Sequence, residues 1–387
     1  MPANVTKKLS ALSTGVGLVL LCYMAYATIY GPYKTTFVHL AIFALCSFVA
    51  LFLDSIIQNI RSKFGILKNF SLLVASVSVL GYFIIEFERL INLWGSTYLS
   101  SWDILLGGLF VIICIEASWR QSLVLGALAV TSCLYMLFGD YLPGVFSHAG
   151  MDFERFIYIV VYTSEGLFGT GLKVAATYLF MFVILGSVLR VTKTGDFMID
   201  MANGLLGSKV GGAAKGAMAA SAGLGTIVGS SIGNVLATGT FTIPLMKRTG
   251  FEPHVAAAVE TNTSEGAQLV PPILGASAFI MAQLTGIPYE VIALAAVVPA
   301  SLYYLSLYSV VHIEALKHNI SGLPEKEIPS IKKTFTRGWH LLVAPISLFY
   351  LLLVGSYTVT FASLIAIFIA IFFGLFRTHT RFSSVDL

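Results

Sequence analysis

Charged side chains are scarce in this 387-residue chain: Asp, Glu, Lys and Arg make up 11% of it, while 57% is hydrophobic. A soluble domain carries about 25% charged residues, so this composition excludes a water-soluble fold. Many apolar runs reach the roughly 20 residues that a helix needs to cross the hydrocarbon core of a bilayer. The runs are continuous rather than alternating, which argues against a transmembrane β-barrel. We therefore predict an all-α polytopic membrane protein.

Residue types that build enzymatic and metal sites are also few. The four cysteines lie inside apolar runs without metal or disulfide spacing, so we interpret them as small buried hydrophobes; they are Cys22, Cys46, Cys114 and Cys133. The chain has no His-Glu-x-x-His and no Gly-x-Ser-x-Gly motif, and its "GSSIG" stretch has no histidine partner at a similar depth. We predict no enzymatic activity and no permanently bound cofactor.

The apolar runs predict about ten transmembrane helices. They lie near 10–30, 36–53, 70–88, 104–118, 122–138, 173–190, 255–283, 289–312, 339–355 and 359–376. The first run has no convincing small-residue cleavage site, so we interpret it as a retained span. The stretch "MDFERFIYIVVYTSEGLFG" after the fifth run mixes apolar and charged positions, which is typical of a helix lying along the membrane interface.

The distribution of basic residues indicates how the chain is oriented. With Lys7 and Lys8 in the cytoplasm, the positive-inside rule places most basic loops on the same side. Lys247 and Arg248 join them only if region 213–246 returns to the side it entered from. That arrangement leaves 19 of the 23 Lys and Arg residues inside and four outside, namely Lys34, Arg89, Arg155 and Lys173. We predict a re-entrant hairpin over 213–246, with arms of about 13 residues, in a multi-pass protein of the cell inner membrane whose N-terminus is cytoplasmic.

The middle of that hairpin reads "GTIVGSSIGNV", residues 225–235. Its glycines and polar residues are more than a membrane-spanning helix requires, and they favour a turn. Non-helical backbone at membrane depth is tolerated only where it is buried in protein or lines a water-filled cavity. We therefore predict that the hairpin turns here and that its tip contributes to a cation or substrate site through Gly229, Ser230, Ser231 and Asn234.

A second interruption, "ETNTSEGAQLVPPILG" (260–275), lies within the run 255–283. Pro271 and Pro272 lack backbone N–H groups, which leaves the carbonyls of Ala267 and Gln268 without helical partners. Broken helices with such groups hold Na⁺ and substrate in secondary transporters. The candidate residues here are Thr261, Asn262, Thr263, Ser264, Glu265, Ala267, Gln268, Pro271 and Pro272. We predict Na⁺ as the coupling ion, with Ser230, Ser231, Asn234 and Gln268 as its ligands.

Two carboxyl groups lie in the same span. An ionisable group at membrane depth is costly and functional by default. Glu265 is six residues before Pro271, so it is a candidate proton or cation site, or a buried group paired with a hydroxyl or a backbone N–H. Glu260 is nearer the cytoplasmic end, and we interpret it as snorkelling to the interface.

Several segments resemble the tripartite ATP-independent periplasmic (TRAP) transporters, specifically the permeases that fuse the small and large membrane subunits. These segments are "EGLFG" (165–169), "ATYLFMFVILG" (176–186), "TGTFTIPLMKRTG" (238–250), "QLVPPILGASAF" (268–279) and "IPYEVIALAAVVPASLYYLSLY" (287–308). The resemblance runs through most of the chain and is strongest from 165 to 316.

The resemblance implies a Na⁺-driven symporter of small organic acids of the carboxylate class, which an extracytoplasmic solute-binding protein supplies. It also implies an elevator mechanism, with the hairpin and the broken helix in the moving domain. Residues 1–140 correspond to the small subunit, 141–172 to an external loop, 173–316 to the first repeat of the large subunit, 317–338 to a cytoplasmic linker and 339–387 to further scaffold helices. Partners are then the binding protein and the lipid bilayer, without nucleic acid.

The chain departs from the family pattern in three places. Val228 stands where the hairpin tip has its first serine, with Ser231 as a replacement oxygen, and Glu265 and Ala267 replace a threonine and a glycine at the second break. The second, inverted hairpin of the family is absent from the sequence, so a second chain or a downstream segment is expected to supply it. The alternative is a non-transporting scaffold or assembly subunit, or an inactive truncated half of a split permease.

Overall fold

The structure is a computed structural model that describes residues 3–58, 62–92, 99–355 and 357–375. Within those ranges every regular element is a helix, which confirms the all-α prediction. Eight helical stretches there are long and apolar enough to cross a membrane: 6–30, 36–58, 63–85, 101–121, 123–141, 170–191, 289–317 and 325–353. Shorter apolar helices cover 276–285 and 359–374. Three basic residues in the charge argument, Arg61, Arg377 and Arg381, lie outside the described residues.

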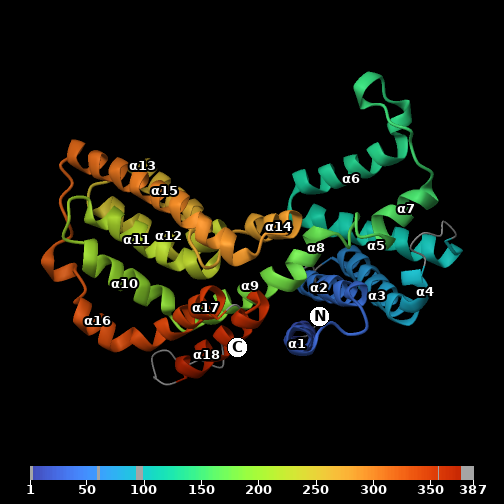
Figure 1. The fold of residues 1–387 in the computed structure, drawn as a ribbon, viewed down its shortest axis with the longest axis horizontal. Helices are drawn as coiled ribbons and strands as arrows, with labels where there is room; N and C mark the ends of the chain where they lie inside the picture. The colour runs from blue at the N-terminus through green and yellow to red at the C-terminus, as the bar shows by residue number, and fades with distance from the viewer. Residues whose placement is uncertain (1–2, 59–61, 93–98, 356, 376–387) are drawn as a thin grey trace. The chain divides into compact units, whose positions relative to one another are not determined.

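The chain forms two compact units, Met1–Ala176 and Thr177–Leu387. The first unit contains α1 (Ala3–Tyr30), α2 (Thr36–Gln58), α3 (Lys63–Ile85), α4 (Phe87–Asn92), α5 (Ser101–Gln121), α6 (Leu123–Phe138), the 3₁₀ turns η1 (Gly139–Tyr141) and η2 (Gly144–Phe146), α7 (Phe153–Tyr162) and α8 (Thr170–Val174) (Figure 1). The predicted start of the third span at residue 70 is wrong. Helix α3 begins at Lys63 because Ser62 Oγ accepts the Gly65 N–H at 3.2 Å and so caps it.

Aromatic rings fill the core of this first unit. The buried Phe83 contacts the rings of Phe37, Phe110, Phe168 and Tyr162, with centroid distances of 5.4, 5.7, 5.9 and 6.1 Å. The predicted helix in the segment 151–169 is confirmed as α7, which buries Tyr162 within the unit. Its position at the membrane interface stays a prediction.

A buried carboxylate ties the helices of the first unit together. Asp103 is fully buried and receives hydrogen bonds from Arg89 Nη1 and Nη2 at 2.9 and 2.7 Å and from the Tyr82 hydroxyl at 2.6 Å. It also forms a capping box with Ser100 at the start of α5. This cluster joins α3, α4 and α5 through one side chain.

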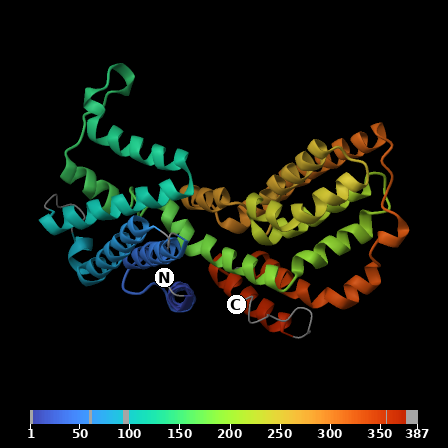
Figure 2. The ribbon, with the colours of Figure 1, turned by 180° about the vertical axis from the view of Figure 1, so that it is seen from behind.

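The second unit begins within a π-helical turn, η3 (Ala175–Leu179), and continues through α9 (Phe180–Val191), α10 (Thr194–Leu206), α11 (Gly212–Val228), α12 (Ser231–Arg248), α13 (Pro253–Gly266), η4 (Ala267–Leu269), α14 (Ala276–Thr285), α15 (Tyr289–Lys317), η5 (Glu325–Glu327), α16 (Ile331–Gly338), η6 (Trp339–Leu342), α17 (Val343–Leu353) and α18 (Val359–Gly374). Helices α11, α12, α13 and α15 lie side by side (Figure 2). Helix α16 lies within the segment 317–338 that was predicted as a cytoplasmic linker, and α10 lies between the predicted span 173–190 and the hairpin; the two helices pack on each other.

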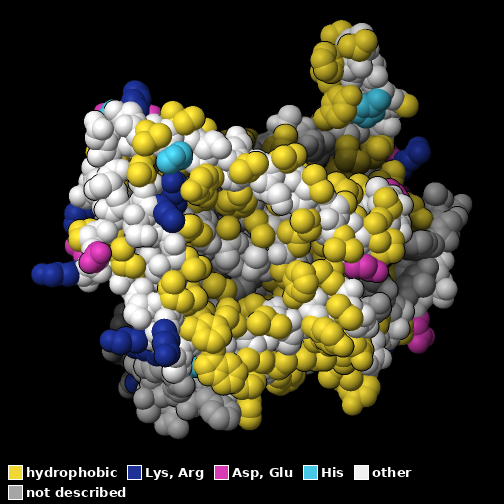
Figure 3. Space-filling view, turned by 60° about the vertical axis from the view of Figure 1, so that its left-hand side comes forward, with side chains coloured by type: hydrophobic (Ala, Val, Ile, Leu, Met, Phe, Trp, Pro, Cys, Tyr) yellow, Lys and Arg dark blue, Asp and Glu magenta, His cyan; other side chains and the backbone are white. Residues whose placement is uncertain are grey.

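Much of the visible surface is hydrophobic side chain, and charged side chains are few (Figure 3). On α15, for example, Val298, Leu302 and Ile313 are 64%, 62% and 64% exposed. Helices of a membrane protein turn such residues toward lipid. The prediction that the cysteines are buried was wrong for the same reason: Cys22 is exposed and the other three are half-buried.

Candidate transport site

The predicted hairpin is present and consists of α11 and α12. They are joined at Gly229, whose φ of 58° lies in the left-handed region that favours glycine, and at Ser230. The Ser230 hydroxyl accepts the Gly233 N–H at 3.3 Å and caps the second arm. The turn therefore falls inside the predicted stretch 225–235. The side chain of Val228, one of the departures from the family pattern, lies outside the described residues.

The arms of the hairpin are longer than predicted. Helix α11 has 17 residues and α12 has 18, which corresponds to about 26 and 27 Å rather than 20 Å. The second arm continues to Lys247 and Arg248, in its last turn, because basic side chains are favourable at a helix C-terminus. The depth of the hairpin in the membrane and the side from which it enters stay predictions.

The second predicted break is also present. Helix α13 ends at Gly266, and α14 begins only at Ala276. The carbonyls of Ala267 and Gln268 have no helical partners, but they are not free. The first accepts the Val270 N–H at 3.2 Å and the second accepts the Gly275 N–H at 2.8 Å. The carbonyls thus lack α-helical partners, as the prolines predicted, and backbone N–H groups of the broken segment take their place.

Tyr289 at the start of α15 supports the broken segment. Its hydroxyl donates to the Pro272 carbonyl at 2.7 Å and accepts the Leu274 N–H at 3.0 Å. Its ring stacks on Phe279 of α14 with centroids 4.4 Å apart. One buried side chain thus takes up two backbone groups of the broken segment, the Pro272 carbonyl and the Leu274 N–H.

The two breaks touch each other. A Cβ on Gly225 would lie 2.3 Å from the Ala267 Cβ, and one on Gly229 would lie 2.8 Å from Ile273 Cγ2 and 3.1 Å from the Leu274 carbonyl oxygen. Side chains larger than hydrogen at these positions would push the hairpin away from the broken helix. The glycines of the hairpin tip therefore permit the close contact that the sequence analysis required of a shared site.

Two of the predicted site residues meet through a third that sequence reasoning missed. Asn234 Nδ2 donates to Ser221 Oγ at 2.7 Å, and Ser221 Oγ lies 3.3 Å from Ser264 Oγ. All three side chains are fully buried. This chain of contacts connects α12, α11 and α13. The oxygen Oδ1 of Asn234 is buried and has no hydrogen-bond partner among the residues that the structure describes.

Other predicted residues lie apart from that chain. Thr261 and Asn262 are exposed and bond to carbonyls of their own helix. Glu265 is also exposed and accepts a hydrogen bond from Gln268 Nε2 at 3.0 Å. The Na⁺ ligand set of Ser230, Ser231, Asn234 and the Gln268 carbonyl stays a prediction.

Glu260 is the residue that the sequence analysis misjudged most. It is fully buried rather than snorkelling. It accepts hydrogen bonds from the hydroxyls of Thr238, Thr242 (2.5 Å) and Ser264 (3.4 Å). The signal was present in the spacing: Asn234, Thr238 and Thr242 repeat every four residues, as do Glu260 and Ser264, which puts each set on one face of a helix.

A buried lysine was also missed, because the analysis had treated it as part of a cytoplasmic loop. Lys215 is 1% exposed and lies in the first turn of α11. Its Nζ is 3.0 Å from His312 Nδ1 and 4.5 Å from the centre of the Tyr308 ring, both on α15. An aromatic face is a partner that suits a cation away from water.

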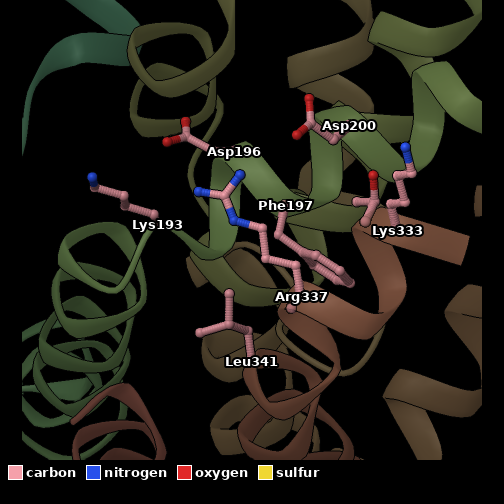
Figure 4. Close-up of a pocket in the computed structure, with 9 residues that line it drawn as sticks. Lys193, Asp196, Phe197, Asp200, Lys333, Arg337 and Leu341 are labelled. Atoms are coloured by element: carbon pink, nitrogen blue, oxygen red, sulfur yellow. The ribbon is translucent and has the colours of Figure 1, made fainter. Parts of the chain in front are cut away.

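A separate pocket of about 340 Å³ lies between α10 and α16 (Figure 4). Its charged lining residues are Lys193, Asp196, Asp200, Lys333 and Arg337. Burial and the nearby Asp196 carboxylate raise the pKa of Asp200, while Arg337 opposes that shift. None of the predicted site residues lines this pocket.

A helical hairpin packed against a broken membrane helix is typical of secondary transporters. A sequence profile of the family described as "Tripartite ATP-independent periplasmic transporter, DctM component" matches residues 106–386, and the chain belongs to this family. The matched region begins inside α5 and covers both breaks.

The chain is also similar to a TRAP transporter large permease protein of Haemophilus influenzae, with 23% identity over 198 residues. The alignment covers 51% of this chain and 46% of that protein. The chain thus matches about half the length of this relative.

Proposed function

We propose that this chain is the membrane permease component of a Na⁺-coupled TRAP-type importer of a small organic acid. An extracytoplasmic solute-binding protein delivers the solute, and the permease lies in the inner membrane with its N-terminus in the cytoplasm. The observation that carries the proposal is the contact between the hairpin tip and the second break, where Gly225 meets Ala267. Family membership supports the permease role.

The helix termini at the two breaks suit an anionic solute. Helix α12 begins at the exposed cap Ser230, and α14 begins after the broken segment at Ala276. A helix N-terminus presents unpaired N–H groups and a partial positive charge, which stabilise a carboxylate. The opposing wall of the site would come from the second inverted repeat, on a partner chain or a downstream segment.

Na⁺ would bind on the neutral oxygens near the same tip. Asn234 Oδ1 is buried and unpaired, and the Gln268 carbonyl retains a second lone pair beside its bond to Gly275. The Ser230 and Ser231 hydroxyls follow Gly229 at the turn. Binding of Na⁺ at these groups would draw the hairpin tip and the broken helix together.

The test is uptake in proteoliposomes that contain this chain, the partner carrying the second repeat and the binding protein, with a panel of labelled carboxylates. We expect uptake to require a Na⁺ gradient. The double variant Ser230→Ala, Asn234→Ala should lower the apparent Na⁺ affinity by about 100-fold or more, because each lost ligand to a charged group is worth about 1.5–3 kcal/mol and every 1.4 kcal/mol is a factor of about ten. Ser309→Ala, whose hydroxyl bonds only to its own helix, is the matched control.

Equal uptake after K⁺ replaces Na⁺ would contradict the coupling. Uptake that persists when this chain is omitted would favour the alternative of a non-transporting scaffold subunit.

A further inference from the structure

Glu260 is a buried carboxyl group with no cationic partner among the described residues. The elements packed against α13 are α11, α12, α15 and η4. Within the structure's described part, no ion pair within 4.0 Å joins Glu260 to any group on them. Their charged or titratable residues are Lys215 on α11, Lys247 and Arg248 on α12, and Tyr289, Glu290, Tyr303, Tyr304, Tyr308, His312, Glu314 and Lys317 on α15, while Glu252, His254 and Glu265 belong to α13 and its cap. Lys215 is directed instead to His312 and the Tyr308 ring.

The two threonines beside Glu260 each have two acceptors for one hydrogen. Thr238 Oγ1 lies 2.9 Å from the Asn234 carbonyl oxygen and also contacts Glu260 Oε1. Thr242 Oγ1 lies 3.0 Å from the Thr238 carbonyl oxygen and 2.5 Å from Glu260 Oε2. A hydroxyl carries a single hydrogen, so each threonine can donate either to its own helix or to Glu260.

The cluster therefore satisfies two protonation states with the same heavy-atom positions. When Glu260 is ionised, both hydroxyls donate to the carboxylate and connect α12 to α13. When Glu260 is protonated, the acid donates to one hydroxyl, which turns to its carbonyl acceptor on α12, while the other hydroxyl still donates to the C=O oxygen of the acid. The second state removes a buried charge that has no cation to compensate it.

The contact distances favour a proton over a metal ion as the ligand. Hard metal cations such as Ca²⁺ and Mg²⁺ lie about 2.0–2.6 Å from each oxygen ligand. Glu260 Oε2 and Thr242 Oγ1 are only 2.5 Å apart, which is a hydrogen-bond separation. Two ligands of one ion would have to move apart.

We propose that Glu260 is a reversible proton-binding site and that its occupancy sets how strongly the second arm of the hairpin is held to α13. Proton binding itself follows from the cluster alone. Its consequence for transport rests on the proposed function. If the hairpin and α13 move within the membrane during transport, a neutral Glu260 would let them move without carrying an uncompensated charge.

The experiment is infrared difference spectroscopy of the full chain in lipid nanodiscs between about pH 4 and pH 9. We expect a protonated-carboxyl C=O band that disappears as the pH rises and is absent in Glu260→Gln. The band should remain in Glu265→Gln, the exposed acid on the same helix. Thr242→Val should shift its frequency, because the C=O group or the acid proton loses a hydrogen-bond partner.

A titrating band that survives Glu260→Gln unchanged would overturn the proposal, as would the absence of any titrating band in the wild type. If Glu260→Gln does not fold, the Thr242→Val shift decides: an unshifted band does not come from this cluster. Uptake assays are a second measurement. The rate of uptake should lose its pH dependence in Glu260→Gln and keep it in Glu265→Gln. Failure of all uptake would contradict the proposed function and leave the infrared result standing.

Discussion

Among the residues that the structure describes, each unit contains one fully buried acidic side chain, and the two are held in opposite ways. In the first unit, Asp103 faces the Arg89 guanidinium at 2.7 and 2.9 Å. In the second unit, Glu260 has only hydroxyl partners, from Thr238, Thr242 and Ser264. A charge matched by a fixed cation favours one arrangement, whereas hydroxyl hydrogens can be redirected. The comparison separates a structural carboxylate from an adjustable one.

The two units also differ in the size of the side chains that pack between their helices. The first unit surrounds Phe83 with large rings, while the hairpin of the second unit is packed through the small buried residues Ala213, Ala214 and Ala217. Interlocked rings resist sliding, because each fills a shaped space. Small residues let helix backbones approach closely without interdigitating. The two units therefore differ in the size of the side chains that lie between their helices.

The largest expected effect comes from breaking the Asp103 cluster. Asp103→Asn should lower the free energy of unfolding by about 3 kcal/mol, because it removes a buried charge from an ion pair and from hydrogen bonds to Tyr82 and Arg89. The measurement is equilibrium unfolding in mixed micelles.

Glu86→Gln is the matched control for that substitution. Glu86 binds the same arginine at 2.9 Å, but both side chains are close to 40% exposed, so the loss should stay below about 1 kcal/mol. Equal losses in the two variants would show that burial of Asp103 contributes nothing to this pair.

The sequence predicted the elements whose signals are local. The prolines at 271–272 located the second break, and the glycines and serines at 225–235 located the hairpin turn. It failed where the outcome depends on a neighbouring helix. Glu260 could not be distinguished from a snorkelling side chain until the threonine face of α12 was seen against it, and α16 looked like a linker because its burial depends on α10.

An intermediate effect is expected at the contact between the two breaks. Gly225→Ala places a Cβ 2.3 Å from the Ala267 Cβ and 2.7 Å from its Cα, so the hairpin tip must move. Overpacking of this kind costs about 1–3 kcal/mol, and uptake should fall with it. Gly223→Ala on the same helix meets only Met198 Sδ at 3.4 Å and should be neutral or slightly stabilising. The same loss in both variants would mean that α11, rather than its contact with the break, is sensitive.

The smallest effect should come from Glu260→Gln, and its contrast with Asp103→Asn is the sharpest form of the comparison. An amide has nearly the shape of the protonated acid and can bond to the same hydroxyls of Thr238 and Thr242. If Glu260 is neutral in the resting protein, the change in unfolding free energy at neutral pH should stay below about 1 kcal/mol. A permanently ionised Glu260 would instead lose charge-assisted hydrogen bonds, each worth about 1.5–3 kcal/mol. A loss as large as that of Asp103→Asn, measured in the same micelles, would make Glu260 a structural carboxylate and remove the difference between the two units.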